Sequence, residues 1–235
     1  MGDFNGDNIV DLGLRNNATG TFFTRYGPDF SYQTTYTWDH SVSNYQSFMG
    51  DYNGDNNVDV GLRDPYTGTF FVRYGPTYTA QTTYTWDNSV SAYQSFVADV
   101  NGDNVVDLGL RNPNTGTFYV RYGPTFSGQT VLNWDNSDVN YQSFMNDVNG
   151  DNIVDLGLRS PTSGTFYVRY GPDFSGQTVF SWDNSISKYQ SMMADVNGDN
   201  IVDLGLRNPN TGVLYVRYGP TFSGQTVYNW AHDGN

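Results

Sequence analysis

A nine-residue loop rich in Asp and Asn recurs five times in this sequence, and it is the feature best suited to chemistry. The loop reads D-x-N-G-D-N-x-x-D and occupies residues 3–11, 51–59, 99–107, 147–155 and 195–203. Positions 1, 3, 5 and 9 offer side-chain oxygens, and position 7 can offer a backbone carbonyl. Calcium prefers about six to eight hard oxygens at roughly 2.3–2.6 Å. The spacing therefore predicts one Ca²⁺ site in each loop, about five in the chain.

The charge distribution of the chain supports a cation in these loops. Each loop holds three Asp, so fifteen of the 24 acidic residues lie in them, and five Ca²⁺ would change the net charge from −13 to −3. Three carboxylates in so short a loop would repel one another without a cation. The predicted metal ligands are Asp3, Asn5, Asp7, Ile9, Asp11, Asp51, Asn53, Asp55, Asn57, Asp59, Asp99, Asn101, Asp103, Val105, Asp107, Asp147, Asn149, Asp151, Ile153, Asp155, Asp195, Asn197, Asp199, Ile201 and Asp203.

Two alternatives to a calcium site stay open at this point. The loops could be solvated turns without metal, although all five copies keep the four side-chain ligands. Magnesium is less favoured, because it retains several waters and takes few protein ligands. An EF-hand is excluded, because that loop needs Gly at position 6 and Glu at position 12, where this chain has Asn and Leu (Leu14 in the first copy). Gly at position 4 and Asn at position 6 are expected to form the bends, since both tolerate left-handed backbone.

The loops belong to a 48-residue repeat that runs without insertion from Asp3 to Trp230. In the third copy, alternating apolar residues predict short strands at 93–98, 106–111, 117–122 and 130–134, and Pro and Gly predict a turn at 112–116. No stretch has the 3.6-residue period of a helix. Four short antiparallel strands per repeat favour an all-β fold, a β-propeller of five four-stranded antiparallel blades.

We expect one β-propeller domain that spans residues 1–235. The first copy lacks the Tyr-Gln-Ser-Phe strand that precedes every other loop, so the array is expected to lack one inner strand. An unpaired sheet edge promotes association. A homo-oligomer, or a partner chain that completes the first blade, is therefore expected. The five repeats are 3–50, 51–98, 99–146, 147–194 and 195–235.

The order of these features resembles the calcium blades of integrin alpha-subunit propellers and the related FG-GAP/VCBS repeats. The resemblance covers essentially the whole chain: the short strand 93–98, the D-x-N-G-D…D-L run, the turn that ends at Gly116 and the aromatic strand 118–122. It implies a calcium-binding propeller in which the loop joins the innermost strand to the second strand of one blade. One departure is Asn at loop position 6, where that family usually has Gly.

Repeated Trp and Arg residues are the candidates for binding an organic ligand. A Trp ring can stack on a sugar, and an Arg fork can bind an acidic sugar. The alternative is structural, with Trp packed between blades and Arg paired with a nearby Asp or carbonyl, and it is favoured for both residue types. The candidates are Trp38, Trp86, Trp134, Trp182 and Trp230, with Arg25, Arg73, Arg121, Arg169 and Arg217.

Composition disfavours several other functions. The net charge of −13 argues against a nucleic-acid partner. The absence of Cys excludes disulfides and thiol chemistry. No apolar run is long enough for a transmembrane helix. The two His residues, His40 and His232, occupy non-equivalent repeat positions, and nothing resembles a catalytic triad. We therefore expect no enzymatic activity.

Three hypotheses for function remain. The first is a non-enzymatic calcium-binding recognition module, with lectin-like glycan binding or cell-surface adhesion. The second is a structural or engineered repeat scaffold with no ligand other than calcium. The third is a polysaccharide-active enzyme, disfavoured because no chemically singular residue cluster is visible. Calcium loops of extracellular modules work at roughly 10⁻⁴–10⁻³ M affinity, so we expect an extracellular or cell-surface location.

Overall fold

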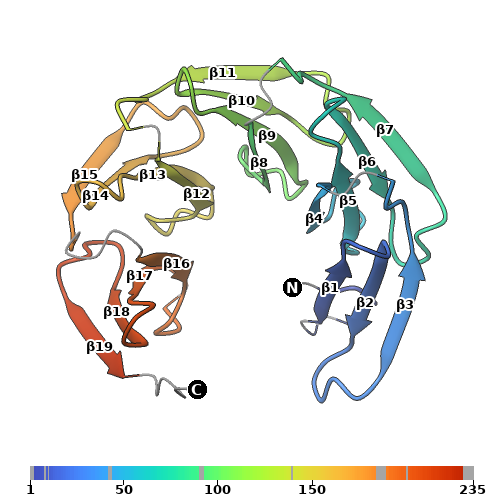
Figure 1. Cartoon of the computed structure of the whole chain (residues 1–235), viewed down its shortest axis with the longest axis horizontal. Helices are drawn as coiled ribbons and strands as arrows, with labels where there is room; N and C mark the ends of the chain where they lie inside the picture. The colour runs from blue at the N-terminus through green and yellow to red at the C-terminus, as the bar shows by residue number, and fades with distance from the viewer. Residues whose placement is uncertain are drawn as a thin grey trace. The chain divides into compact units, whose positions relative to one another are not determined.

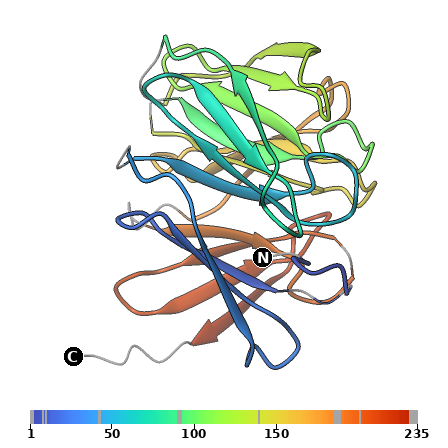
Figure 2. The ribbon, with the colours of Figure 1, turned by 90° about the vertical axis from the view of Figure 1, so that its right-hand side faces the viewer.

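The computed structural model describes residues 3–7, 9, 11–41, 44–89, 93–138, 140–183, 189–199 and 201–229, and within them the chain consists of strands and loops without a helix (Figures 1 and 2). The strands are β1 (Leu12–Asn16), β2 (Thr21–Arg25), β3 (Gln33–Thr37), β4 (Gln46–Gly50), β5 (Asp59–Arg63), β6 (Thr69–Arg73), β7 (Gln81–Thr85), β8 (Gln94–Ala98), β9 (Asp107–Asn112), β10 (Thr117–Arg121), β11 (Gln129–Asn133), β12 (Gln142–Asn146), β13 (Asp155–Arg159), β14 (Thr165–Arg169), β15 (Gln177–Ser181), β16 (Gln190–Ala194), β17 (Asp203–Arg207), β18 (Val213–Arg217) and β19 (Gln225–Asn229).

Each repeat forms one antiparallel sheet in which neighbours in sequence are neighbours in space. The second to fifth sheets have the orders β4-β5-β6-β7, β8-β9-β10-β11, β12-β13-β14-β15 and β16-β17-β18-β19. The first sheet, β1-β2-β3, has three strands among the described residues. The predicted all-β propeller of repeated blades is confirmed. In the third copy, the predicted strands agree with β8 to β11 to within one residue.

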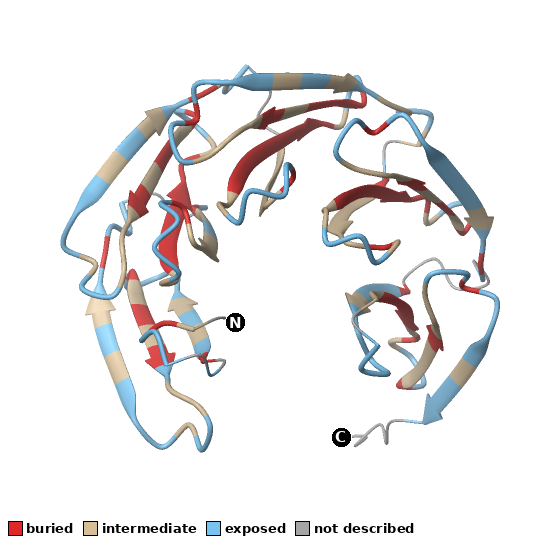
Figure 3. Ribbon diagram, turned by 180° about the vertical axis from the view of Figure 1, so that it is seen from behind, coloured by how far each residue is buried: buried red, intermediate tan, exposed pale blue. Residues whose placement is uncertain are grey.

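The middle strands of the second sheet are more buried than its outer strand. All five residues of β5 are buried, whereas β7 alternates between exposed and partly buried residues. In β6, Phe70 and Val72 are buried on one face and Phe71 is partly buried on the other. A sheet with two apolar faces must be covered on both sides. Figure 3 shows the buried residues concentrated in these middle strands.

The chain divides into two compact units. One contains residues 1–99 and 103–134, with β1 to β11, and the other contains residues 100–102 and 135–235, with β12 to β19. In the first unit, the side chains of one sheet cover the next sheet. Trp38 and Phe22 of the first sheet share an apolar cluster with Val60 and Leu62 of the second sheet.

A glycine in the second strand of the blade allows an aromatic ring to lie against the backbone. A Cβ built on Gly109 would lie 1.7 Å from the ring of Phe96, and one on Gly157 would lie 1.7 Å from the ring of Phe144. Both aromatic residues come from the strand that pairs directly with the glycine strand. The repeated glycine is therefore a packing requirement of the sheet.

Candidate functional site

The Asp at loop position 1 organises the Asp/Asn loop through backbone amides. One oxygen of Asp51, Oδ1, accepts hydrogen bonds from the amides of Gly54 at 2.7 Å and Asp55 at 3.2 Å. The other oxygen, Oδ2, accepts from the amide of Asn56 at 2.7 Å. Asp147 of the fourth loop makes the same contacts with Gly150, Asp151 and Asn152. This carboxylate therefore fixes the curvature of the loop.

Positions 3 and 5 face each other inside the loop. The Asn53 side-chain amide nitrogen donates to Asp55 Oδ2 at 3.0 Å, and the Asp55 amide donates to Asn53 Oδ1 at 2.9 Å. The Asn57 backbone amide donates to Asp55 Oδ1 at 2.8 Å. The side-chain contact between positions 3 and 5 recurs in the first, fourth and fifth loops. The loop thus gathers an amide and two carboxylates within a short stretch of chain.

The predicted bends of the loop are confirmed. Gly54 at position 4 has a φ of +82° and Asn56 at position 6 has a φ of +64°. The corresponding Asn104 and Asn152 have the same left-handed conformation. Asn8 and Asn200 lie outside the described residues. Asn therefore serves at position 6, where the resembled repeats usually have Gly.

The Asp at position 9 is a buried clamp, a role that the sequence analysis did not predict. Asp59 is fully buried, and its Oδ2 accepts from the Tyr52 amide at 2.9 Å while its Oδ1 accepts from the Gly75 amide at 2.8 Å. Burial, with the nearby charges of Asp55 and Asp51, raises the pKa of Asp59 to about 6 against the opposing effect of these hydrogen bonds. Asp59 therefore connects the start of the loop to the turn after the third strand of the blade.

The same clamp occurs in the second compact unit. Asp155 accepts from the Val148 amide at 2.9 Å and from the Gly171 amide at 3.0 Å, and burial raises its pKa to about 6. The available sequence signal was the constant spacing of sixteen residues between this Asp and the Gly of the Gly-Pro pair. The contact could not be inferred from the spacing, because only strand pairing in the folded sheet places the two residues side by side.

Consecutive loops also contact each other. The amide of Val58 in the second loop donates to the Asp3 carbonyl at 3.1 Å, and the amide of Val106 in the third loop donates to the Asp51 carbonyl at 2.8 Å. The Asn57 side chain at position 7 lies near Gly6 of the preceding loop. The side chain at position 7 of the second loop thus lies against the preceding loop. A calcium contact through the backbone carbonyl of position 7 stays a prediction.

The described residues contain no group of three or more His, Asp or Glu side chains arranged to hold a metal ion. In the loops, the predicted ligands lie together in sequence, but the carboxylates of positions 1 and 9 accept hydrogen bonds from backbone amides. The assignment of Ca²⁺ therefore stays a prediction that rests on the donor set and on the repetition of the loop.

The structure places Trp38, Trp86 and Trp182 at contacts between sheets. Trp38 is buried, and its Nε1 donates to Gln81 Oε1 of the next sheet at 3.2 Å. The guanidinium of Arg73 lies 4.8 Å from the Trp38 ring centroid, and its Nε donates to the same Gln81 oxygen at 3.2 Å. The same cluster joins Trp86 to Gln129 and Arg121.

The remaining members of this predicted ligand set fall into four groups. In the second compact unit, Trp182 makes the corresponding contacts with Gln225 and Arg217. Trp134 is partly buried, and Arg169 donates to Gln177 at 3.3 Å. Trp230 lies outside the described residues. Arg25 lines an open pocket on the first sheet.

A polar pocket of about 450 Å³ lies beside the fourth sheet, at the junction of the third and fourth repeats, and the sequence analysis missed it. Asp138 occupies a position where three other repeats have Val42, Val90 and Ile186. Burial alone would raise the pKa of Asp138, but hydrogen bonds, chiefly from Ser160, hold it below the usual value. The Ser160 hydroxyl lies 2.6 Å from Asp138 Oδ2. The pocket is lined by Ser137, Asp138, Tyr141, Ser160, Thr162, Ser163 and Tyr167.

Comparison with known proteins finds distant similarity among solved structures. No model of a known protein family matches the sequence, and no curated protein matches it. Among solved structures, the chain is similar to the V. cholerae biofilm matrix protein Bap1, with 18% sequence identity and a TM-score of 0.40. The match covers 92% of this chain and 36% of the Bap1 chain, so this chain spans little more than a third of that protein. The FG-GAP/VCBS assignment stays a prediction.

The structure also bears on membrane association. Within the part of the chain that it describes, no helix is long and apolar enough to cross a membrane.

Proposed function

We propose that this chain is a non-enzymatic, calcium-stabilised β-propeller module that recognises an extracellular ligand rich in hydroxyl groups, such as a glycan. The observation that carries the proposal is the loop around Asp51. Its left-handed bends gather carboxylate and amide oxygens, and its backbone contacts recur in both compact units. Carboxylate, amide and carbonyl oxygens are the donors that calcium prefers.

The electrostatics of position 9 favour a cation near the loop. Burial disfavours the ionised form of Asp59, and the neighbouring Asp55 and Asp51 add repulsion. A divalent ion beside these groups would stabilise the ionised carboxylates. On binding, Asn53 and Asp55 would exchange their mutual contact for contacts with the ion. No such change is needed in the bends, because Gly54 and Asn56 already have the required conformation.

Calcium is expected to bind to and stabilise the chain. Titration of the EDTA-treated protein, followed by calorimetry, should give about five Ca²⁺ per chain and a melting temperature that rises with calcium. A site that binds only the folded state contributes about 2.7 kcal/mol at a ligand concentration one hundred times its dissociation constant. Magnesium should give a much smaller effect.

A matched pair of variants tests the location of the ions. Asp151→Asn removes one carboxylate at loop position 5 and should reduce the stoichiometry by one. Asp173→Asn changes an exposed Asp outside the loops and should leave the stoichiometry unchanged. Equal binding by wild type and Asp151→Asn, or a chain that takes up no calcium, would contradict the proposed metal sites.

The polar pocket around Asp138 is the proposed recognition surface. Hydroxyls from the loop before β12 and from the turn between β13 and β14 surround Asp138, and the Tyr141 and Tyr167 rings meet edge to face at 6.0 Å. Hydroxyl and carboxylate groups bind sugar hydroxyls by hydrogen bonds, and aromatic rings supply apolar contact. This pocket replaces the Trp residues as the favoured site, because Trp38, Trp86 and Trp182 are buried between sheets.

Asp138→Val should abolish glycan binding at a modest cost in stability, because the Ser160 hydroxyl loses its acceptor. The substitution introduces the residue type that two other repeats carry at this position, so the blade should tolerate it. Binding would be measured on a glycan array in calcium, followed by calorimetry on any glycan that binds wild type, with Asp173→Asn as control. Undiminished binding by Asp138→Val would exclude this pocket as the site.

The structural scaffold is the second candidate, and the burial of the Trp–Gln–Arg clusters favours it. In that case calcium would bind, but the glycan array would show no ligand. Turnover of a polysaccharide would instead support the enzyme hypothesis.

A further inference from the structure

The contacts between sheets in each compact unit follow one pattern. One sheet offers what we call the receiving face, which in the second sheet consists of Val60, Leu62, Phe71, Arg73 and Gln81. Val60 and Leu62 are buried under Phe22, Trp38 and neighbouring residues of the first sheet, and Phe71 is partly buried against them. Arg73 and Gln81 hold the Trp38 indole. The third and fifth sheets follow the same pattern. Leu108 and Leu110 of the third sheet, and Leu204 and Leu206 of the fifth sheet, are buried in clusters with residues of the preceding sheet.

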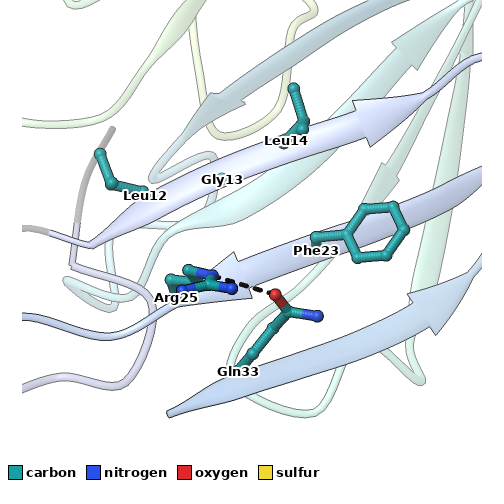
Figure 4. A pocket seen from close by; sticks show the side chains of 6 residues that line it. All are labelled: Leu12, Gly13, Leu14, Phe23, Arg25 and Gln33. Carbon is teal, nitrogen blue, oxygen red and sulfur yellow. Dashed lines mark hydrogen bonds between the residues drawn. The ribbon is translucent and has the colours of Figure 1, made fainter. Parts of the chain in front are cut away.

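Within the first compact unit, the described residues of the first sheet present the same receiving face in exposed form. Its equivalents are Leu12, Leu14, Phe23, Arg25 and Gln33, which with Gly13 line a pocket of about 420 Å³ (Figure 4). The side chain of Leu14 is 68% exposed, whereas its equivalent Leu62 is 0% exposed. Arg25 Nε donates to Gln33 Oε1 at 3.1 Å, as Arg73 does to Gln81. The first sheet therefore already contains the hydrogen-bonded Arg–Gln pair that in the second sheet contacts a Trp ring.

The fifth sheet presents the opposite half, which we call the covering face. It includes Met192, Leu214 and Tyr228, and Met192 and Leu214 line a second open pocket. Met192 and Tyr228 are among the exposed large apolar residues of the chain. In the fourth sheet, the equivalent of Tyr228 is Phe180, which stacks on Phe222 of the next sheet with ring centroids 5.0 Å apart. The covering Trp of the fifth repeat, Trp230, lies outside the described residues.

We propose that the receiving face of the first sheet binds the covering face of the fifth sheet in a second copy of this chain. One chain carries both halves, and each half matches, residue by residue, an apolar contact formed within the units. The proposed contact places Tyr228 of one copy against Phe30 of the other, as Phe180 lies against Phe222. Because two different surfaces meet, the assembly is head-to-tail and closes into a ring or continues as a filament.

The first test measures the mass of the whole chain by sedimentation velocity across a wide range of concentration. The wild type should show species larger than the 26.3 kDa chain that become more abundant as the concentration rises. Leu14→Glu should weaken association at least about tenfold, because the contact would bury an unpaired charge. Val131→Glu is the matched control, since Val131 is an exposed apolar residue on the outer strand β11, and it should associate like wild type.

A mixing experiment tests the head-to-tail geometry. Tyr228→Glu disables the covering face and leaves the receiving face intact, so its self-association should be weakened as in Leu14→Glu. A mixture of Leu14→Glu and Tyr228→Glu should form a dimer that does not grow further, because one intact half remains on each chain. Unchanged circular dichroism and melting temperature would show that both variants are folded.

Two outcomes would overturn the proposal. One is a wild-type chain that stays monomeric at every concentration, whether its receiving face binds its own fifth sheet or stays open. The other is an oligomer that Leu14→Glu does not weaken, which would place the interface elsewhere.

Discussion

Asp59→Ala is expected to lower the free energy of unfolding by about 2–4 kcal/mol in calcium-free buffer. The substitution leaves the Tyr52 and Gly75 amides without the acceptor that each now has. A buried amide without a partner costs about 1–3 kcal/mol. Removal of a desolvated carboxylate offsets part of that loss, since its ionised form is disfavoured by burial. The measurement is urea denaturation followed by Trp fluorescence.

Two further variants separate this clamp from general effects of losing an Asp. Asp59→Asn keeps one acceptor oxygen and should lose less stability than Asp59→Ala. Asp173→Ala removes an exposed carboxylate and should change the unfolding midpoint little. If Asp59→Ala were as stable as Asp173→Ala, the clamp would have no structural importance.

Arg63→Ala is expected to cost about 3–5 kcal/mol, the range for truncation of a large buried side chain. The guanidinium of Arg63 lies 5.7 Å from the Phe70 ring centroid and 5.9 Å from that of Tyr93. Its Nη1 donates to Gln46 Oε1 at 3.3 Å, and its Nη2 donates to the Asp87 carbonyl at 3.3 Å. Ala would leave a cavity between two rings and would remove both hydrogen bonds.

Arg63→Met separates the contribution of side-chain volume to stability from that of the guanidinium charge. Met refills most of the space and removes the desolvated guanidinium, whose Nε has no hydrogen-bond partner among the described residues. Replacement of a buried ion by an apolar side chain of similar volume is often neutral. We expect urea denaturation to place Arg63→Met within about 1 kcal/mol of wild type. A loss equal to that of Arg63→Ala would show that the hydrogen bonds of Arg63 decide its contribution.

The sequence analysis predicted neither the contacts of Asp59 nor those of Arg63. Asp59 was predicted as a metal ligand, and the structure adds its contacts with Tyr52 and Gly75. The sequence analysis did not name Arg63, which donates to the Asp87 carbonyl. The Phe70 and Tyr93 rings on either side of it come from elements that the repeat pattern alone did not bring together.

The sequence by itself determined the repeat, the strand positions and the bends of the loop. These features are local: alternation of apolar residues predicts a strand within a few residues, and Gly54 and Asn56 favour left-handed backbone wherever they lie. The strand order within each sheet was also predictable, because strand pairing within a blade joins neighbours in sequence. None of these predictions required knowledge of how one sheet packs on another.

Tertiary structure alone decided which repeated residues are covered and which are open. Trp38 meets Gln81 across 43 residues, and that contact forms only when one sheet covers the next. Leu14 and Leu62 occupy the same repeat position, yet one is exposed and the other is buried. A repeated sequence encodes the same side chain at each position, whereas burial depends on the neighbouring sheet, so the open faces could be identified only in the folded chain.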